Sequence, residues 1–463
     1  MTQPCDLSAV EARRQIGAAT LSVSALLESC IARIEEHNPK VNAVVATCYE
    51  RARKEAAVMD ASKEHLPELP PLFGLPVLIK DLIDTEELTT TYGSLCFEGH
   101  VPQKDAGVVD SLRQAGAIIL GKTNTPEFGA GANTFNKVYG ATRNPHNTDL
   151  TCGGSSGGSA VAVACGMAPL AIGSDFGGSL RIPASFCGVI GMRPTPGRIP
   201  CASLAIGHSP LWTEGPMARS VEDAALCMAA IEGYDASDPR ATPLVERTSL
   251  AALDLKNIKI GVSADLGLGE LDHEIRKVFE NRVSTLAPCF AQTKTISPDL
   301  SAAPEVFRNI RVMDVYAATH KLIKAHGDKL GDNITKNISL AKELSFADVA
   351  QANASHTTLF KAFHELFKTH DILICPATAV SPFPVEQPFP TEINGAPVED
   401  YVAWYAVTWA LSLMGCPIVT VPAGTDHNGM PFGLQIIAPR HRDGFAFCVA
   451  AEVENALKQK GVA

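Results

Sequence analysis

Three serines in one glycine-rich stretch are the residues of this chain best suited to chemistry. Residues 153–191 read GGSSGGSAVAVACGMAPLAIGSDFGGSLRIPASFCGVIG, and glycines surround Ser155, Ser156 and Ser179. A serine hydroxyl is a weak nucleophile unless a base takes its proton. The stretch therefore predicts nucleophilic catalysis by one of these serines, and it requires a base.

The second glycine-rich turn of the stretch is suited to binding an anion. It reads DFGGS over residues 175–179, and Arg181 and Pro183 follow it. Successive backbone N–H groups in such a turn can converge on one point, which is the arrangement that stabilises an oxyanion without reorganisation. A helix of small residues and a short strand separate this turn from the first one.

The base that serves the serine has two candidate types. Residues 154–158 fit the G-x-S-x-G pattern of hydrolases that use histidine, but that fold needs a strand directly before the serine. Residues 144–149, NPHNTD, resemble a loop instead, and none of the 13 histidines has a convincing C-terminal setting. The other candidate is Lys80, which ends the apolar run 76–79. A lysine at a strand end usually points to water, whereas a lysine in a buried polar pocket becomes a base near neutral pH.

The elements that position these residues alternate between buried strands and helices. Apolar runs predict strands at 76–79, 117–120, 170–173, 258–262, 372–375, 418–421 and 434–437. Helical patterns lie between them, for example at 108–115 and 221–231, and an N-terminal helix begins near residue 23 and should stop at Asn38-Pro39. We therefore expect an α/β fold with one large, mixed, twisted sheet between helices. We expect a single domain over 1–463, with a mainly helical insertion around 303–371.

Composition narrows the functional class. The chain has 463 residues, 46% hydrophobic and 19% charged, with a net charge of −11. This charge argues against nucleic-acid binding. The first residues lack the pattern of a signal peptide, and no apolar run of 18 residues suggests a membrane span.

Thirteen scattered cysteines are typical of the cytoplasm. We interpret Cys152 and Cys187, near the serines, as small buried hydrophobes. No motif suggests a metal or another cofactor.

Six segments together resemble the amidase signature family of Ser–Ser–Lys amide hydrolases. In chain order they are GLPVLIKD (74–81), GKTNTPEF (121–128), RNP (143–145), GGSSGGSA (153–160), GSDFGGSLRIPASFCGVIGMRPT (173–195), and GCPIVTVPAG with PFGLQIIAPR (415–440). They cover most of the chain, and the central block is long and specific. The resemblance implies the amidase signature fold and a small-molecule amide as substrate.

The resemblance also implies a role for each matched residue. Ser179 corresponds to the nucleophile, Ser155 to the proton-relaying serine that follows a cis peptide, and Lys80 to the general base. The N–H groups of the turn correspond to the oxyanion hole: Phe176, Gly177, Gly178 and Ser179. Ser156, Asp175 and Arg181 correspond to residues that support the two turns. Glu127 and Asn124 match a motif that supports the site.

The substrate is less well defined by the sequence. We expect hydrolysis of a carboxylic amide, with an aryl or apolar group as one option, through a seryl acyl-enzyme. Candidate pocket walls are 134–135, 204–212, 307–316 and 404–409. The alternatives are the glutamine-hydrolysing subunit of a tRNA amidotransferase and a hydrolase of urea- or biuret-type carbamoyl amides. Ile182 argues against the former, because those subunits usually carry Gln there. A homodimer is left open.

Overall fold

The predicted apolar runs lie in one mixed sheet of 11 strands. The structure is a computed structural model that describes residues 3–244, 247–269 and 271–462. The strand order is β1-β3-β2-β6-β8-β7-β14-β15-β11-β9-β10. These strands are β1 (Val44–Thr47), β2 (Pro76–Lys80), β3 (Ile118–Thr123), β6 (Leu170–Asp175), β7 (Ile190–Arg193), β8 (Thr213–Ala218), β9 (Lys259–Val262), β10 (Gln292–Thr295), β11 (Ile372–Pro376), β14 (Ile418–Thr425) and β15 (Pro431–Ile437). Two small hairpins lie outside it, formed by β4 (Phe135–Asn136) with β5 (Gly140–Ala141) and by β12 (Glu392–Ile393) with β13 (Ala396–Pro397).

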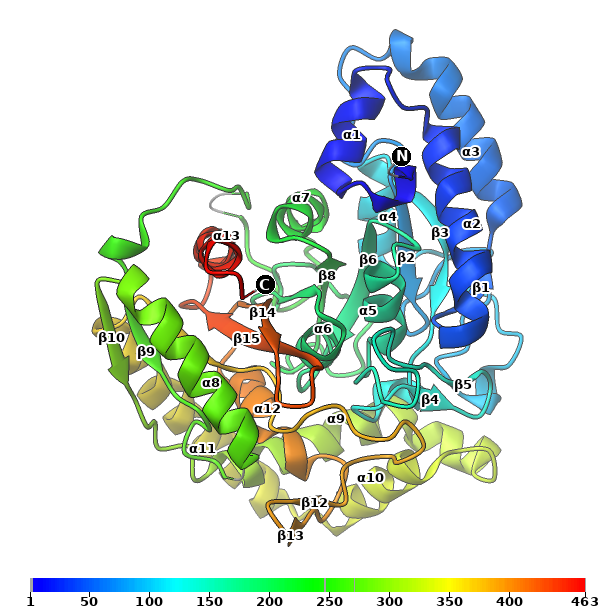
Figure 1. The fold of residues 1–463 in the computed structure, drawn as a ribbon. Helices are drawn as coiled ribbons and strands as arrows, with labels where there is room; N and C mark the ends of the chain where they lie inside the picture. The colour runs from blue at the N-terminus through cyan, green and yellow to red at the C-terminus, as the bar shows by residue number, and fades with distance from the viewer. Residues whose placement is uncertain (1–2, 245–246, 270, 463) are drawn as a thin grey trace.

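Thirteen helices are present in the described part of the chain. They are α1 (Ala9–Gly17), α2 (Val23–Val41), α3 (Tyr49–Ser62), α4 (Gly107–Gln114), α5 (Gly157–Ala164), α6 (Arg181–Cys187), α7 (Val221–Ile231), α8 (His273–Leu286), α9 (Ala303–His326), α10 (Asp332–Glu343), α11 (Phe346–His364), α12 (Ala406–Leu413) and α13 (Asp443–Gln459). In Figure 1, α7 and α13 lie above the central strands, and α9, α11 and α12 lie below them. The predicted α/β architecture, with a mixed sheet between helices, is confirmed.

The sheet is parallel where the candidate site is built. β2 pairs in parallel with β3 and with β6, so the carboxyl ends of these three strands lie at one edge. β8 then pairs antiparallel with β6 and brings Glu214 opposite Ser174. Every residue of β2 and of β6 is buried. The side chains that end β2 and β6 therefore meet below the surface.

All seven predicted strands are present, and four further strands of the sheet were not predicted. β7 and β8 contain glycine, methionine, arginine, glutamate and proline, so they lack a continuous apolar run. β10 is a polar edge strand. β1 is a short strand at the other edge, with only one buried residue. Strands of these kinds give no clear hydrophobic signal.

The expected end of the N-terminal helix was wrong by three residues. α2 continues to Val41 with Pro39 inside its last turn, and Asn42 ends it in the left-handed conformation. The Asn38 side chain accepts hydrogen bonds from the backbone of Ala43 and Val44 at 2.8 Å each. The position of Pro39 therefore does not mark the end of the helix. The contacts of the Asn38 side chain determine where the chain leaves it.

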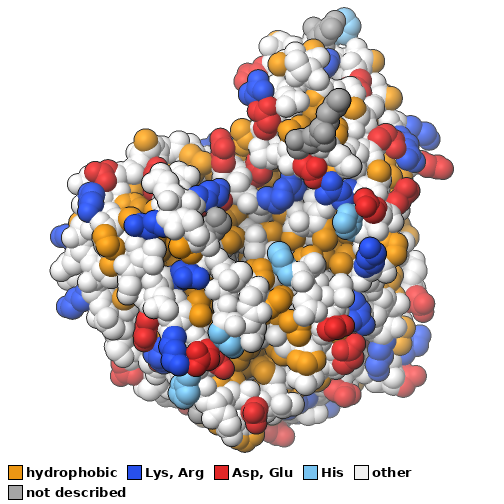
Figure 2. Space-filling view, viewed as in Figure 1, with side chains coloured by type: hydrophobic (Ala, Val, Ile, Leu, Met, Phe, Trp, Pro, Cys, Tyr) orange, Lys and Arg blue, Asp and Glu red, His pale blue; other side chains and the backbone are white. Residues whose placement is uncertain are grey.

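The segment predicted as a helical insertion, 303–371, contains α9, α10 and α11 and a short 3₁₀ turn, Glu365–Lys368. Its helices pack on one another, and α9 also packs on α12. The face of the molecule in Figure 2 carries acidic and basic side chains side by side, without a large area of one sign. None of the described helices is both long and apolar enough to cross a membrane.

Candidate active site

Lys80 is the last residue of β2 and meets three serine hydroxyl groups. Its Nζ forms hydrogen bonds with the Oγ atoms of Ser155 at 2.6 Å, Ser156 at 2.9 Å and Ser174 at 3.1 Å. Ser174 belongs to β6, the parallel neighbour of β2, and the other two serines follow the first glycine-rich turn. The fold thus brings Lys80 to a serine that lies 75 residues further along the chain.

The electrostatic setting of Lys80 favours its neutral form. The side chain is completely buried, and within the described residues it forms no ion pair. Loss of hydration lowers the pKa of Lys80 well below its ordinary value, although the charges of Asp175 and Glu214 act in the opposite direction. A neutral amine can accept a proton from a hydroxyl group, so the geometry and the charge state both suit a base.

The first glycine-rich turn is held by its neighbours. The peptide bond between Gly154 and Ser155 is cis. Thr134 Oγ1 donates to the carbonyl of Gly153 at 2.8 Å and accepts from the N–H of Gly157 at 3.2 Å. At the next position, Gly158, a Cβ atom would collide with the backbone of Asn124. The turn can therefore pass this close to the loop after β3 only with glycine at 158.

Ser156 contacts residues of both glycine-rich turns. Its hydroxyl donates to the carbonyl of Ser174 at 3.0 Å and accepts from the Ser174 N–H at 3.2 Å. Its own backbone N–H donates to the carbonyl of Ser179 at 3.1 Å. Ser156 is completely buried, whereas Ser179 is partly exposed to a cavity. These contacts suit Ser156 to support and leave Ser179 accessible.

The second turn presents backbone donors beside Ser179. Within the described chain, the N–H groups of Phe176, Gly177 and Ser179 have no protein acceptor. The N–H of Gly178 differs, because it donates to Asp175 Oδ1 at 2.9 Å. Gly178 therefore helps to hold the turn in shape, and its N–H, which the resemblance assigns to the oxyanion hole, is already bound to Asp175. Three donors remain for a developing oxyanion.

The hydroxyl groups of Ser155 and Ser179 face the same cavity but are not hydrogen-bonded to each other in the described structure. Catalytic hydrogen bonds are often long in a free enzyme and shorten when substrate is bound. The arrangement places Lys80 on Ser155 and not on Ser179. A proton from Ser179 would thus have to pass through Ser155.

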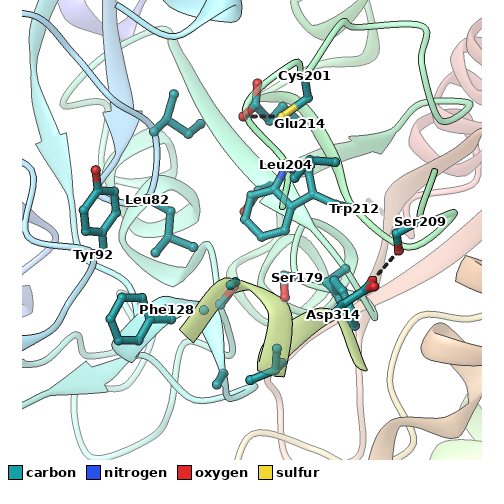
Figure 3. A pocket seen from close by; sticks show the side chains of 18 of the residues that line it. Leu82, Tyr92, Phe128, Ser179, Cys201, Leu204, Ser209, Trp212, Glu214 and Asp314 are labelled. Atoms are coloured by element: carbon teal, nitrogen blue, oxygen red, sulfur yellow. Dashed lines mark hydrogen bonds between the residues drawn. The ribbon is translucent and has the colours of Figure 1, made fainter. Parts of the chain in front are cut away.

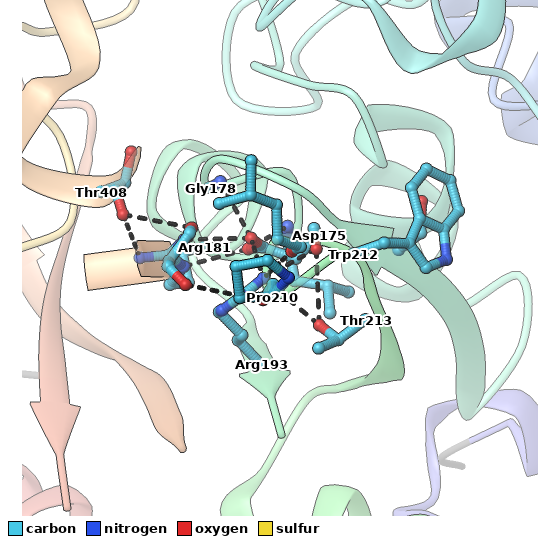
Figure 4. Close-up of polar contacts among 12 residues, drawn as sticks. Asp175, Gly178, Arg181, Arg193, Pro210, Trp212, Thr213 and Thr408 are labelled. Carbon is cyan, nitrogen blue, oxygen red and sulfur yellow. Dashed lines mark hydrogen bonds and ion pairs between the residues drawn. The ribbon is translucent and has the colours of Figure 1, made fainter. Parts of the chain in front are cut away.

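Asp175 is the centre of a buried ionic network (Figure 4). Its carboxylate accepts hydrogen bonds from the backbone of Gly178 and Leu180 and from both Arg181 and Arg193, at 2.9–3.1 Å. All three charged side chains are completely buried. The two guanidinium groups hold the pKa of Asp175 far below its usual range, even though burial alone would raise it.

The two arginines link this carboxylate to distant parts of the chain. Arg181 donates to the Thr408 carbonyl at 2.8 Å, to Ser412 Oγ at 2.8 Å and to Gln435 Oε1 at 2.9 Å. Arg193 donates to the carbonyl groups of Asp175 and Leu211 at 2.7 and 2.8 Å. The second glycine-rich turn is therefore fixed to α12, β15 and the loop before β8.

Three residues of the site were missed by the sequence prediction: Ser174, Arg193 and Glu214. Arg193 ends a buried strand inside the quoted GMRPT motif, so the motif could have indicated that this arginine belongs to the site. Ser174 directly precedes the predicted Asp175. Glu214 had no signal, because its position opposite Ser174 depends on strand pairing.

A cavity of about 760 Å³ opens above Ser155 and Ser179 (Figure 3). Apolar and aromatic side chains form much of its wall: Leu82, Tyr92, Phe128, Phe176, Ile182, Leu204, Ile206, Trp212, Phe307, Val315, Tyr401 and Tyr405. The expected pocket segments 204–212 and 307–316 contribute to this wall. From 404–409 only Tyr405 does so, because Trp404 and Trp409 belong to the apolar core.

The expected pocket segment 134–135 was wrong. Thr134 is buried beneath the first glycine-rich turn, and Phe135 is 41% exposed on the β4–β5 hairpin.

Glu127 lies nearby and connects two walls of the cavity. Its carboxylate accepts from Ser94 Oγ at 2.7 Å and from the N–H of Gly331 at 2.7 Å. It thus joins the loop of Phe128 to the start of α10.

The cysteines near the site do not resemble nucleophiles. Cys152 and Cys187 are buried, and desolvation raises the pKa of Cys152 to about 12 and that of Cys187 further. A thiol needs a lowered pKa to react. Among the described residues, no group of three or more His, Cys, Asp or Glu side chains is arranged to hold a metal ion.

The ionic network predicts a large effect of Asp175→Asn on stability. The change leaves Arg181 and Arg193 buried without their counter-charge, so we expect the free energy of unfolding to fall by about 3–5 kcal/mol. A urea titration followed by circular dichroism measures this difference. Glu11→Gln is the matched control, because it breaks an exposed ion pair with Arg14 at 2.6 Å and should barely move the midpoint. Equal shifts for the two variants would contradict the prediction.

Comparison with known proteins agrees with this geometry. The family model described as Amidase matches residues 25–445. The chain is 34% identical to an acylamidase of Rhodococcus erythropolis, over 97% of this chain and 95% of that protein. It is also 34% identical to one subunit of the glutamyl-tRNA(Gln) amidotransferase of Koribacter versatilis, over 94% of this chain and 95% of that protein.

Solved structures show the same relationship. A bacterial aryl acylamidase of the amidase signature family superposes with a TM-score of 0.91 at 28% identity, over 97% of this chain and 96% of that one. The corresponding amidotransferase protein of Thermotoga maritima gives a TM-score of 0.72 at 26% identity, over 96% of this chain and 92% of that one. Sequence motifs, fold and family match together establish that the chain belongs to the amidase family.

Proposed function

We propose that this amide-cleaving hydrolase acts alone on small amides through an acyl-enzyme on Ser179. The observation that carries the proposal is the position of Lys80, whose Nζ is buried, forms no ion pair with any carboxylate of the described residues, and lies 2.6 Å from Ser155 Oγ. A lysine in this state can act as a base, and Ser155 lies between it and the cavity. Ser179 is the serine that faces the cavity beside free backbone donors.

The proposed reaction has two halves. Neutral Lys80 takes the proton of Ser155, and Ser155 takes that of Ser179 as Ser179 Oγ attacks the amide carbonyl carbon. The N–H groups of Phe176, Gly177 and Ser179 stabilise the resulting oxyanion. Protonated Lys80 returns a proton through Ser155 to the leaving nitrogen, so the C–N bond breaks and an amine or ammonia departs. Water, deprotonated by the same route, then cleaves the ester.

The cavity supports an apolar or aryl amide as substrate. Its wall is rich in aromatic and aliphatic side chains, which is typical of sites for such groups. The name of the Rhodococcus relative and that of the aryl acylamidase structure agree with this choice. Ile182, 1% exposed, occupies a cavity position at which a glutamine-hydrolysing subunit usually has Gln.

The second candidate is the glutamine-hydrolysing subunit of an amidotransferase. It is favoured by relatives of that name with similar identity and coverage. A hydrolase of carbamoyl amides is a third option, since a structural neighbour at 30% identity comes from s-triazine catabolism.

We also propose that the protein works in the cytoplasm, without nucleic acid or a membrane as partner. All 13 cysteines are free, which suits a reducing compartment. A homodimer stays an open alternative.

The three serines should respond differently to substitution. Ser179→Ala should lower kcat by a factor on the order of 10³–10⁶ and abolish labelling by an activated ester, because the nucleophile is lost. Ser155→Ala should lower kcat strongly yet leave Ser179 in place. Mass spectrometry of the trapped acyl-enzyme locates the label, and the exposed Ser301→Ala is the control. A label on Ser156 would refute the assignment.

The pH dependence of kcat/KM should report Lys80. The base acts when neutral, so activity rises with pH through its pKa; because burial lowers that pKa, the rise should be complete well below the ordinary value of 10.5. Lys80→Met should remove both the activity and the rise, whereas Lys336→Met on the surface should keep them. A profile that rises only near pH 10.5 would contradict a neutral buried lysine. Thermal unfolding of each variant checks that it is folded.

A substrate panel separates the candidate functions. We expect the purified chain alone to hydrolyse anilides and aliphatic amides with a kcat/KM at least about tenfold above that for glutamine or biuret, because the cavity wall is mainly apolar. Amine and ammonia release are the measurements. Glutaminase activity that appears only with added partner subunits would favour the amidotransferase instead, and preference for biuret would favour the third option.

A further inference from the structure

Two buried carboxylates in the cavity wall have no cationic partner. Among the described residues, neither Glu214 nor Asp314 forms an ion pair. Glu214 is 5% exposed, and its hydrogen-bonding neighbours are the thiol of Cys201, 3.6 Å from Oε1, and the side chain of Trp212. Asp314 Oδ2 accepts from Ser209, and among the described residues Oδ1 has no hydrogen-bond partner. A buried carboxylate normally has more partners than these, so both groups can accept further hydrogen bonds.

Chain connections place the two carboxylates on the same part of the cavity wall. Trp212 and Glu214 are two residues apart where β8 begins, a spacing that puts side chains on one face. The loop before them is held by Arg240, which donates to the carbonyl groups of Ser209 at 3.0 Å and Trp212 at 2.7 Å. Ser209 in turn binds Asp314 on α9. Figure 3 shows the Trp212 ring between Glu214 and Asp314.

The nearby cations do not neutralise this part of the wall. Arg240 is paired with Asp238 at 3.3 Å, and its charge lowers the pKa of Glu214 and of Asp314 by less than burial raises them. Arg311 also lines the cavity, but its guanidinium lies 6.0 and 5.6 Å from the ring centres of Phe307 and Tyr401 and donates to the Tyr401 hydroxyl. Burial raises the pKa of Glu214 and that of Asp314 to about 7. Both carboxylates are thus ready to ionise when a cation arrives.

The chemistry of the three side chains identifies a ligand class. Carboxylate oxygens attract an ammonium group and accept its hydrogen bonds, and the face of an indole ring attracts a cation. The remaining wall is mainly apolar, and Ser179 lies in the same cavity. We propose that Glu214, Trp212 and Asp314 form a subsite for a positively charged amine. The preferred substrates would then be amides that carry an ammonium group, separated from the scissile carbonyl by an apolar spacer. This inference rests on the proposed function.

Binding to Ser179→Ala protein tests the subsite without turnover. The probes are two matched pairs, each an ammonium compound and its methyl isostere: 5-aminopentanoyl anilide with hexanoyl anilide, and 4-(aminomethyl)acetanilide with 4-ethylacetanilide. The first pair carries the charge on the acyl side, the second on the amine side. Calorimetry at pH 7.5 should give at least tenfold tighter binding for the ammonium member of one pair. The measured quantity is the ratio of the Kd of the methyl member to that of the ammonium member. A ratio near one for both pairs would overturn the proposal.

Substitutions in the same background locate the effect. Glu214→Gln and Asp314→Asn should each lower the ratio at least about fivefold, and Trp212→Leu should lower it more than Trp212→Phe. Asp299→Asn is the matched control, because it alters an exposed Asp–Ser pair, with Ser301, away from the cavity. A ratio that none of the site variants changes would also overturn the proposal. Should Trp212→Leu be unfolded, the two isosteric carboxylate variants still decide.

The test of the ammonium subsite and the test of the proposed acyl-enzyme mechanism can fail independently. If the ammonium probes bind as expected while the wild-type protein forms no acyl-enzyme on Ser179, the subsite stands and the proposed mechanism fails. If acylation occurs and the binding ratios stay near one, the mechanism stands and the subsite fails.

Discussion

The carboxylate of Asp175, paired with two buried arginines, is the interaction on which the site depends. A buried charge is costly unless it is paired and fully hydrogen-bonded, and removal of one partner leaves the others uncompensated. Asp175 satisfies this condition with Arg181, Arg193 and two backbone N–H groups. Because the arginines also bind α12, β15 and the loop before β8, these three segments fix the position of the second glycine-rich turn.

Lys80 shows the opposite solution at the end of the neighbouring strand. It is as buried as Asp175, but its contacts are neutral hydroxyl groups, so its proton is held weakly. The structure therefore separates two tasks within one edge of the sheet. A fully paired ionic network gives rigidity, and a buried amine surrounded by hydroxyl groups gives the base of the proposed mechanism.

The sequence allowed the buried strands and the candidate serines to be predicted, for physical reasons that particular residues show. Strands such as β2 and β6 are buried on both faces, and their continuous apolar runs reveal them. The serines share one stretch, so local spacing identified them. Its place at a strand end made Lys80 a candidate base, but its pairing with the serines depends on strand pairing, and the family resemblance was needed to choose it. Glu214 was missed because a glutamate in a glycine- and proline-containing strand resembles a loop residue.

Errors at the cavity wall have a similar cause. An aromatic residue in a loop has the same pattern whether it faces a cavity, the core or water, as Tyr405, Trp404 and Phe135 show. The donor role of Gly178 could not be judged either, since the direction of one N–H depends on the position of the Asp175 side chain.

The cavity wall formed by α9 has a consequence for how such an enzyme can diversify. Phe307 and Val315 are far along the chain from residues 153–191. Apart from the Ser209–Asp314 bond, the hydrogen bonds described for the reactive groups do not involve this helix. Replacement of side chains on the cavity face of α9 can thus change which substrates fit the cavity. The contacts among Lys80 and the serines stay the same. Laboratory evolution of new selectivity would best begin with the α9 side chains that line the cavity.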